Sequence, residues 1–296
     1  MDLLDIPLDF GCEPSIAVPT KRAAHEAALP GSTQSTGLWV VAGELADAAF
    51  LDPPYNVANQ GHAGGNGVIK HREFAYASGD MSSAEFKGFL HNTLGALATV
   101  SKNGAVHFVC MDHHHADELI EVGGEIYGAR LNICVWVKPN GGMGSLYRSK
   151  HEFIFVYRIG DAPHMNNVEL GRHGRNRTNV WEYNSVNMFG GRSADLEMHP
   201  TCKNPAMVAD AIRDVTKRGQ IVLDGFLGSG TTLVAAVQSD RRAFGLEIDA
   251  AYVDVAVQRW MALTGEDAVL EATGETFAKV AHRRQAEKQQ EVACHG

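Results

Sequence analysis

A strand, a glycine-rich turn and a helix follow one another near residue 225, and this succession constrains the fold more than any other feature. The apolar run 220–223 predicts a buried strand that ends at Asp224. Residues 233–238 predict a helix, and between the two lies the turn Gly225-Phe226-Leu227-Gly228-Ser229-Gly230-Thr231-Thr232. In such a unit, the bare backbone of the glycines lets a nucleotide-like ligand approach the N-terminus of the helix. The stretch therefore predicts a βα unit with a ligand site at its turn.

The residues around this turn exclude some classes of ligand and favour others. A phosphate-binding P-loop needs Lys after its last glycine, and here Thr231 follows Gly230, which excludes an NTPase of that type. The dinucleotide pattern Gly-x-Gly-x-x-Gly is absent from the turn as well. A second predicted strand, 243–248, carries Glu247 near its end, 23 residues after Asp224. Because an acid at that spacing commonly holds the ribose hydroxyls of an adenosine ligand, this half predicts a nucleoside-cofactor site.

A second candidate site is the tetrapeptide Asp52-Pro53-Pro54-Tyr55, which follows the apolar run 48–51, another predicted buried strand. The two prolines fix φ and lack N–H groups, so the chain leaves the sheet along a stiff, extended path. The Asp52 carboxylate and the Pro53 carbonyl can accept the two hydrogens of an amino group on a flat ring, on which Tyr55 can stack. An ordinary structural turn has the same composition, so the tetrapeptide alone leaves both interpretations open.

Composition excludes several classes of protein. The 296 residues, of which 45% are hydrophobic, can bury a sizeable core as one large α/β domain or two smaller ones. No apolar run reaches the 18 or more residues that span a bilayer, so no membrane partner is expected. The five cysteines are scattered and never form a Cys-x-x-Cys pair, which is typical of reduced thiols in a cytoplasm.

Charge is unevenly distributed along the chain. The net charge is −9, yet residues 138–192 hold eight basic and four acidic residues, a local excess of +4. Arginines suit phosphates and guanine edges, and Trp181, Tyr183 and Phe189 could stack on or wedge between bases. A solvated basic face, or a loop packed over the core, would have the same composition. The predicted DNA-binding residues are Arg148, Lys150, Arg172, Arg175 and Arg177.

Weaker patterns predict the remaining elements. The glycine-rich, partly basic loop 58–79 is typical of a mobile lid or, equally, of an exposed insertion. Ser82 with Glu85 predicts a helix N-terminus by the capping-box pattern. His113, His114 and His115 point different ways at the start of a predicted helix and lack a second ligand cluster, so no metal site is expected. Further strands are predicted at 38–42, 104–110, 131–137 and 152–157, and helices at 82–101, 114–124 and 250–263.

The two candidate sites together resemble a known family. Asp52-Pro53-Pro54-Tyr55 followed by Asp224-Gly225-Phe226-Leu227-Gly228-Ser229-Gly230-Thr231 is similar to the S-adenosylmethionine-dependent amino-DNA methyltransferases, in the motif order of their circularly permuted beta class. His199-Pro200-Thr201-Cys202-Lys203 resembles a third family motif, and the similarity covers roughly residues 38–280. Relatives often carry a ParB-like domain, for which this chain has no room.

The resemblance implies a Rossmann-like class I methyltransferase fold, a seven-stranded, mainly parallel sheet with helices on both faces. It implies that Asp52, Pro53, Pro54 and Tyr55 are catalytic. It also implies an S-adenosylmethionine site formed by Asp224, Phe226, Gly228, Ser229, Gly230, Thr231 and Glu247, with Thr201 and Lys203 near the methionine end. The reaction it implies is direct methyl transfer to an amino group of a base flipped out of double-stranded DNA. Asp at position 52 favours adenine N6, with cytosine N4 as the alternative.

Because of three departures from the family pattern, a non-catalytic DNA-binding homologue stays an alternative hypothesis. Gly225 and Asn204 stand where relatives usually have proline, and the stretch between Gly43 and Leu51 is shorter than in relatives. Methylation of RNA or of a protein amide is a third alternative, disfavoured because those enzymes more often have Asn at position 52. The expected domains are an arm at 1–36, a catalytic domain at 37–280 with a target-recognition insert at 160–198, and a tail at 281–296. The sequence does not determine the recognition sequence, whether the protein forms a homodimer, or whether it has a restriction endonuclease partner.

Overall fold

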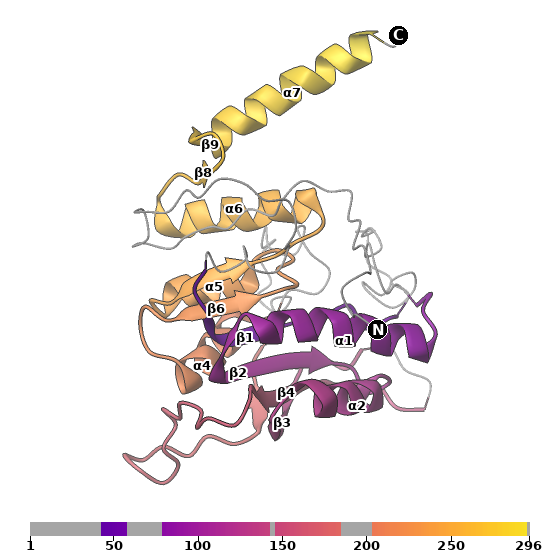
Figure 1. Ribbon diagram of the computed structural model, residues 1–296, viewed down its shortest axis with the longest axis vertical. Coiled ribbons are helices and arrows are strands. Elements are labelled where there is room, and N and C mark those ends of the chain that lie inside the picture. Colours follow the sequence, from indigo (N-terminus) through magenta and orange to yellow (C-terminus); the bar gives the residue numbers. More distant parts are fainter. Residues whose placement is uncertain (1–42, 58–78, 143–145, 185–202, 295–296) are drawn as a thin grey trace.

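The computed structural model describes residues 43–57, 79–142, 146–184 and 203–294, and the side chains up to 286. Seven strands form one sheet in the order β5-β3-β4-β2-β1-β6-β7, and β4 runs opposite to its neighbours while the other pairings are parallel (Figure 1). The predicted seven-stranded, mainly parallel sheet is therefore confirmed. The strands are β1 (Ala46–Leu51), β2 (Ser101–Met111), β3 (Ala129–Val137), β4 (His151–Arg158), β5 (Val180–Glu182), β6 (Ile221–Asp224) and β7 (Arg242–Gly245).

Helices begin where local side chains satisfy their free N–H groups. In α1, Ser82 and Glu85 form the predicted capping box, with the Ser82 N–H donating to Glu85 over 2.9 Å. Helix α2 begins at Ala116, two residues later than predicted, because Asp112 accepts from the N–H groups of His114 and His115 and holds them in a turn. The helices are α1 (Ser83–Thr99), α2 (Ala116–Ile126), α4 (Pro205–Val215), α5 (Thr231–Gln238), α6 (Ala250–Thr264) and α7 (Phe277–Cys294).

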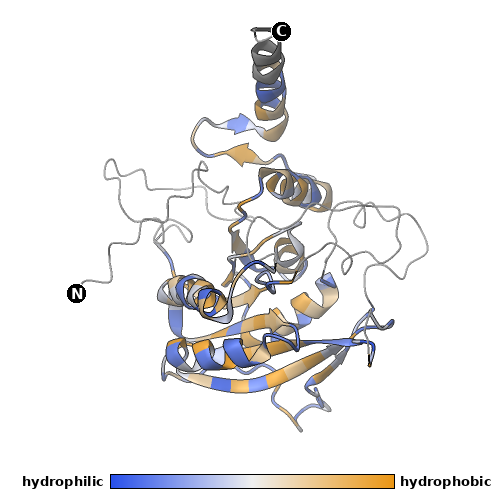
Figure 2. Ribbon diagram, turned by 90° about the vertical axis from the view of Figure 1, so that its right-hand side faces the viewer, coloured by the Kyte–Doolittle hydropathy of each residue, from blue (hydrophilic) through white to orange (hydrophobic). Residues whose placement is uncertain are grey.

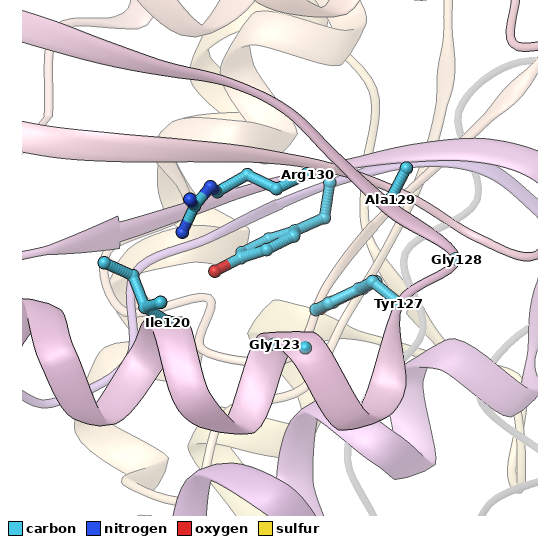
Figure 3. Close-up of a pocket in the computed structure, with 8 residues that line it drawn as sticks. Ile120, Gly123, Tyr127, Gly128, Ala129 and Arg130 are labelled. Atoms are coloured by element: carbon cyan, nitrogen blue, oxygen red, sulfur yellow. The ribbon is translucent and has the colours of Figure 1, made fainter.

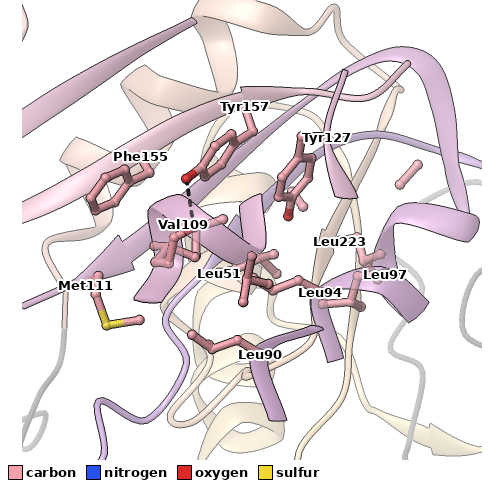
Figure 4. Packing of buried hydrophobic residues seen from close by; sticks show 14 of the residues in the cluster. Leu51, Leu90, Leu94, Leu97, Val109, Met111, Tyr127, Phe155, Tyr157 and Leu223 are labelled. Atoms are coloured by element: carbon pink, nitrogen blue, oxygen red, sulfur yellow. Dashed lines mark hydrogen bonds between the residues drawn. The ribbon is translucent and has the colours of Figure 1, made fainter. Parts of the chain in front are cut away.

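Alternation along the strands places a core on each face of the sheet. Leu51 of β1 and Leu223 of β6 pack with α1 and α2, and Figure 4 shows this cluster around Leu90 and Leu94. Phe50 and its neighbours on the other face pack against α4 and α5. Figure 2 shows the hydrophobic residues concentrated on the central strands and on the helix faces that meet them. Helices therefore cover both faces, as the resemblance implied.

The start of β1 and the residues just before it are anchored to three other strands. Glu44 pairs with Arg242 at the start of β7 over 2.7 Å, and Asp47 pairs with Lys102 of β2 over 2.6 Å. Asp47 also accepts from the N–H of Ile221 at the start of β6 over 2.9 Å. These contacts hold β1 between β2 and β6. The predicted strand 38–42 and the predicted lid, apart from Gly79, lie outside the described residues.

The C-terminal part extends away from the sheet. After α6, the hairpin of β8 (Val269–Leu270) and β9 (Glu275–Thr276) leads into α7, which projects from the body (Figures 1 and 2). A helix thus crosses the expected boundary between the catalytic domain and the tail at residue 280. Among the described residues, no helix is long and apolar enough to cross a membrane.

Candidate active site

The two motifs lie at the same edge of the sheet, at the ends of adjacent strands. β1 and β6 pair in parallel, with Ala48 opposite Val222 and Ala49 opposite Leu223. Asp52 follows the last residue of β1, and Asp224 is the last residue of β6. Some 170 residues of chain separate the two acids, and the parallel pairing brings them together at the carboxyl edge, where open α/β sheets bind ligands.

Asp52 is held by two partners, one on each carboxylate oxygen. The Tyr55 hydroxyl donates to Oδ1 over 2.6 Å, and the Lys203 ammonium donates to Oδ2 over 2.8 Å. Pro53 is buried at the turn. After the turn, the Asn56 side chain forms hydrogen bonds with the backbone of Met81, just before α1. The stiff Asp-Pro-Pro-Tyr turn therefore presents an oriented carboxyl group at the edge of the sheet.

Lys203 is the centre of a cluster of charged side chains that we call the catalytic corner: Asp52, Tyr55, Lys138, Glu152 and Lys203. Its side chain is 6% exposed, and its ammonium donates to Asp52, to Glu152 over 2.8 Å and to Tyr55 over 3.2 Å. The other oxygen of Glu152 pairs with Lys138. Three N–H groups of an ammonium thus meet three acceptors, which satisfies a cation buried this deeply.

Two members of the corner, Glu152 and Lys138, were not predicted as site residues. Glu152 lies in β4 opposite Trp136, and Lys138 follows the end of β3. A charged residue within the otherwise apolar strand 151–157 was the available signal, since such residues are rarely buried unless paired. Only the placement of β4 beside β2 shows that the partner is Lys203.

The electrostatics of the corner favour the charged forms of Glu152 and Lys203. Burial alone would raise the pKa of Glu152, but Lys203 and Lys138 outweigh burial and bring that pKa to about 2. Burial would lower the pKa of Lys203, and the nearby Asp52 and Glu152 raise it well above its ordinary value instead. The corner therefore holds two carboxylates and two ammonium groups, and its net charge is zero.

Tyr55 occupies a position that differs from the expected stacking arrangement. Its hydroxyl donates to Asp52 and lies 3.4 Å from Glu152. Burial, followed by the charges of Asp52 and Glu152, raises the pKa of this hydroxyl. Tyr55 therefore stays protonated and donates its hydroxyl hydrogen to Asp52.

On the cofactor side, the glycine turn folds around two carboxylates. Asp224 accepts from the N–H of Phe226 over 2.9 Å, and burial raises its pKa to about 7. Asp52 is among the charges that contribute to this rise, as the pairing of β1 with β6 leads one to expect. Glu247 accepts from the N–H groups of Gly228, over 2.7 Å, and Asp249, over 2.9 Å. Strand β7 ends at Gly245, earlier than predicted, so that Glu247 lies in the loop and can turn towards the glycines.

The remaining turn residues are fixed by packing. Gly230 precedes α5 as its N-cap at φ 84°, and a Cβ there would lie 2.9 Å from that of Ala256. Ser229 is buried, and its carbonyl accepts from Arg259 of α6 over 2.7 Å. Thr231 is buried as the first residue of α5. The turn therefore has one well-defined shape against α6.

Two departures from the family pattern have structural explanations. A Cβ at Gly225 would lie 2.6 Å from Leu97 of α1, so the position suits glycine in this chain. Asn204 caps α4, and its side chain accepts from the N–H of Ala206 over 2.8 Å. Thr201, predicted near the methionine end, lies outside the described residues.

The predicted DNA-binding residues fall into two groups at opposite edges of the sheet. Arg148 and Lys150 are exposed on the loop between β3 and β4, beside the catalytic corner. Arg172 and Arg175 belong to the loop after β4 (Figure 1). In this loop, the Asn167 side chain donates hydrogen bonds to backbone carbonyls at the C-terminal end of α4, which lies at the amino edge of the sheet. Because β4 runs antiparallel, it delivers the start of the expected target-recognition insert to the far edge, and β5 then carries the chain back to the carboxyl edge, where the Asn184 carbonyl accepts from the Asn204 side chain next to Lys203.

Arg177 and the aromatic residues after it have structural partners. Arg177 pairs with Asp214 of α4 over 2.6 Å and covers the ring of Trp181. Trp181 is buried in the core beside Phe108, which corrects the expectation that it stacks on DNA bases. The Tyr183 hydroxyl donates to Asp210 over 2.7 Å. Phe189 lies outside the described residues.

A pocket between α2 and the start of β3 is separate from the catalytic corner. Figure 3 shows it lined by Gly123, Tyr127, Arg130 and Tyr157 among others. These residues lie at the amino end of β3, whereas Lys138 follows its carboxyl end. The pocket is therefore at the opposite edge from Asp52 and Asp224.

Comparison with known proteins agrees with this geometry. The Type II methyltransferase M2.MboI of Moraxella bovis is 25% identical over 225 residues, which cover 74% of this chain and 81% of that protein. The M1.HpyAVI–SAM complex shares the fold at a TM-score of 0.54 and 20% identity, covering 73% of this chain and 89% of that chain. The PvuII DNA methyltransferase, described as cytosine-N4-specific, has a TM-score of 0.56 at 16% identity over 73% of this chain and 80% of that chain.

A family model described as DNA methylase matches residues 46–258, a span that runs from the start of β1 into α6 and includes every member of the catalytic corner. The chain therefore belongs to the N6/N4 DNA methylase family.

Proposed function

We propose that the protein transfers a methyl group from S-adenosylmethionine to the N6 amino group of adenine in double-stranded DNA. The observation that carries this proposal is the meeting of Asp52 and Asp224 at the carboxyl ends of two parallel, adjacent strands. A carboxylate for an amino group and a glycine turn for a nucleoside cofactor then share one edge. The designation of M2.MboI as a Type II methyltransferase supports a site-specific enzyme of that kind.

The residues of the glycine turn fit an adenosine cofactor that carries a positive charge. Glu247 faces Gly228 at the turn, where its carboxylate can accept hydrogen bonds from ribose hydroxyls. Asp224 is buried without a basic partner among the contacts described for it, which suits a cationic ligand. Phe226, half-buried against Phe89, would line the adenine end. The SAM complex of M1.HpyAVI supports the choice of cofactor.

The cofactor supplies an electrophilic methyl group bonded to a positively charged sulfur. Asp52 accepts a hydrogen bond from the adenine amino group and favours the form whose lone pair is free to attack. The lone pair forms the new C–N bond as the C–S bond breaks, and the sulfur keeps that electron pair. The nitrogen then loses one proton, which Asp52 is placed to accept and pass to solvent. No covalent enzyme intermediate is needed.

DNA approaches the carboxyl edge, because the corner opens there. The loop between β3 and β4 carries Arg148 and Lys150 together with Leu146 and Tyr147, whose side chains are 82% and 84% exposed. Basic residues beside exposed apolar ones suit phosphates and unstacked bases. The target base must leave the duplex to reach Asp52, at a cost of a few kcal/mol.

Transfer of tritiated methyl groups to duplex DNA tests the proposal. We expect the wild-type protein to label DNA and Asp52→Ala to lose at least about a hundredfold in rate, because it removes the acceptor for the amino group. Glu121→Gln on the exposed face of α2 is the control and should keep wild-type activity. Equal labelling by wild type and Asp52→Ala would refute the proposal. Recovery of N4-methylcytosine from the digested product would change the target base to cytosine.

A further inference from the structure

The electrical neutrality of the catalytic corner depends on Glu152, a residue that lies two strands away from Asp52. The sheet order is β4-β2-β1, and Glu152 reaches from β4 to the Lys203 ammonium that also binds Asp52. Both side chains are largely buried, at 14% exposure for Glu152 and 6% for Lys203. Charges buried to this extent interact through a medium less polarisable than water, so an imbalance among them acts strongly.

Methyl transfer from a sulfonium is sensitive to such an imbalance. The cofactor approaches the site with a positive charge, and that charge passes to the amino nitrogen as the new bond forms. A corner with net positive charge would repel both species, whereas a neutral corner does not. Without Glu152, the ammonium groups of Lys138 and Lys203 would face Asp52 alone, and the corner would carry a charge of +1.

Glu152 also limits how strongly Lys203 occupies Asp52. The Lys203 ammonium divides its three N–H groups among Asp52, Glu152 and Tyr55. With Glu152 removed, two of these acceptors would remain, and Lys203 would pair more closely with Asp52. Asp52 would then be a weaker acceptor for the amino group of the target base.

We propose that Glu152 is a positioning residue for methyl transfer, which holds Lys203 between two carboxylates and keeps the catalytic corner electrically neutral. Glu152 does not touch the reacting atoms, and it acts through Lys203. This inference rests on the proposed function, and it concerns a residue of β4 outside both sequence motifs.

Charge-balanced variants test this role. Glu152→Gln keeps the shape of the side chain and leaves the corner at +1. We expect its kcat to fall at least tenfold while the KM for DNA changes less than threefold. The reason is that the unbalanced positive charge opposes the transfer step, in which positive charge moves to the amino nitrogen. Adding Lys138→Met restores neutrality, so the double variant should be faster than Glu152→Gln alone. A purely structural role predicts the opposite, since a second buried substitution would lower activity further.

Cofactor affinity provides a readout that needs no turnover. S-adenosylmethionine carries the sulfonium charge and S-adenosylhomocysteine does not, so calorimetry with both separates charge from shape. In Glu152→Gln, we expect the Kd for S-adenosylmethionine to rise at least threefold and that for S-adenosylhomocysteine to change less than twofold. The double variant should return the ratio of the two Kd values towards that of the wild type.

A matched pair on the surface serves as control. Lys87 of α1, which is half-buried, pairs with the exposed Glu121 of α2 over 3.0 Å, and Glu121→Gln with and without Lys87→Met should leave kcat and both Kd values unchanged. Should Glu152→Gln fail to fold, Glu152→Asp keeps the charge and should retain more than a third of wild-type kcat.

The outcomes separate this inference from the proposed function. A wild-type protein that binds neither cofactor would overturn both. If the wild type is active, any of three results would overturn this inference alone. These results are a kcat of Glu152→Gln within twofold of wild type, a double variant slower than the single one, and an equal loss of affinity for the two cofactors in Glu152→Gln. Loss of more than tenfold in kcat by Glu152→Asp would also overturn it.

Discussion

At the scale of single residues, His107 shows how a polar group is kept neutral inside the core. The ring lies fully buried in β2, between the Ser101 hydroxyl at 2.9 Å and the Tyr127 hydroxyl at 3.2 Å. Because the Ser101 hydroxyl donates to the Leu97 carbonyl over 2.8 Å, it accepts from His107 Nε2–H, and Nδ1 is left to accept from Tyr127. Burial lowers the pKa of His107 to about 3.

This burial predicts a loss of stability in mild acid. Between pH 6.5 and 3 the unfolded chain binds a proton at residue 107 that the folded chain does not, so the free energy of unfolding falls as pH falls. The slope from this one group approaches about 1.4 kcal/mol per pH unit. Urea unfolding of wild type and His107→Gln at pH 8, 6, 5 and 4 measures it. The variant should lose less stability across this window, and equal losses would contradict the assignment; the exposed His91→Gln is the control.

At the scale of elements, the direction of β4 decides which loop lies beside the catalytic corner. β3 ends at the carboxyl edge and β4 begins there, so the loop between them lies beside the catalytic corner. β4 ends at the amino edge, where Asn103 of β2 binds Asp161 over 2.9 Å. The loop that carries Arg172 and Arg175 therefore starts far from the corner.

This arrangement predicts different salt dependences for two surface cations. Lys150→Ala should weaken DNA binding and reduce the slope of log Kd against log salt concentration by about one, since one phosphate contact is lost. Arg175→Ala should leave the slope unchanged and serves as the matched control. Fluorescence anisotropy with labelled duplex at four salt concentrations measures both slopes. A reduced slope in Arg175→Ala with an unchanged one in Lys150→Ala would reverse the proposed approach of DNA.

At the scale of the whole molecule, α7 contributes little to the core. Phe277 at its start packs against the cluster around Trp260 and Ala268, while the described side chains from Lys279 onwards are exposed or half-buried. The helix contacts the hairpin of β8 and β9 and projects away from the sheet. The stability of the domain should therefore depend on Phe277 but not on most of α7.

Two truncations test this division. A chain that ends at Ala278 keeps Phe277, and its Tm should change by less than about 3 °C. A chain that ends at Thr264 also loses Ala268 and Phe277 from the cluster, and its Tm should fall by at least about 5 °C. Differential scanning calorimetry measures both. Equal Tm values for the two truncated chains would show that the cluster does not need its C-terminal members.

The strands β1 to β4, β6 and β7, the helices α1, α2, α5 and α6 and the two motifs followed from the sequence alone, because their causes are local, whereas β5, α4 and α7 were not predicted. Alternating and continuous apolar runs define β1 to β4, the Ser82–Glu85 pair begins α1, and glycine and proline mark the turns after β1 and β6. Each of these signals depends on residues within a few positions of one another. The seven-stranded sheet itself was inferred from the resemblance and confirmed by the structure.

Only the tertiary structure decided which distant residues meet. The bond from Lys203 to Glu152, the place of Tyr55 on Asp52 and the far position of Arg175 all follow from the order and direction of the strands. Strand order is set by the packing of helices on both faces. The local sequence around a residue therefore does not show which residue it pairs with across the sheet. The two motifs could therefore be found in the sequence, whereas the charge balance that joins them required the fold.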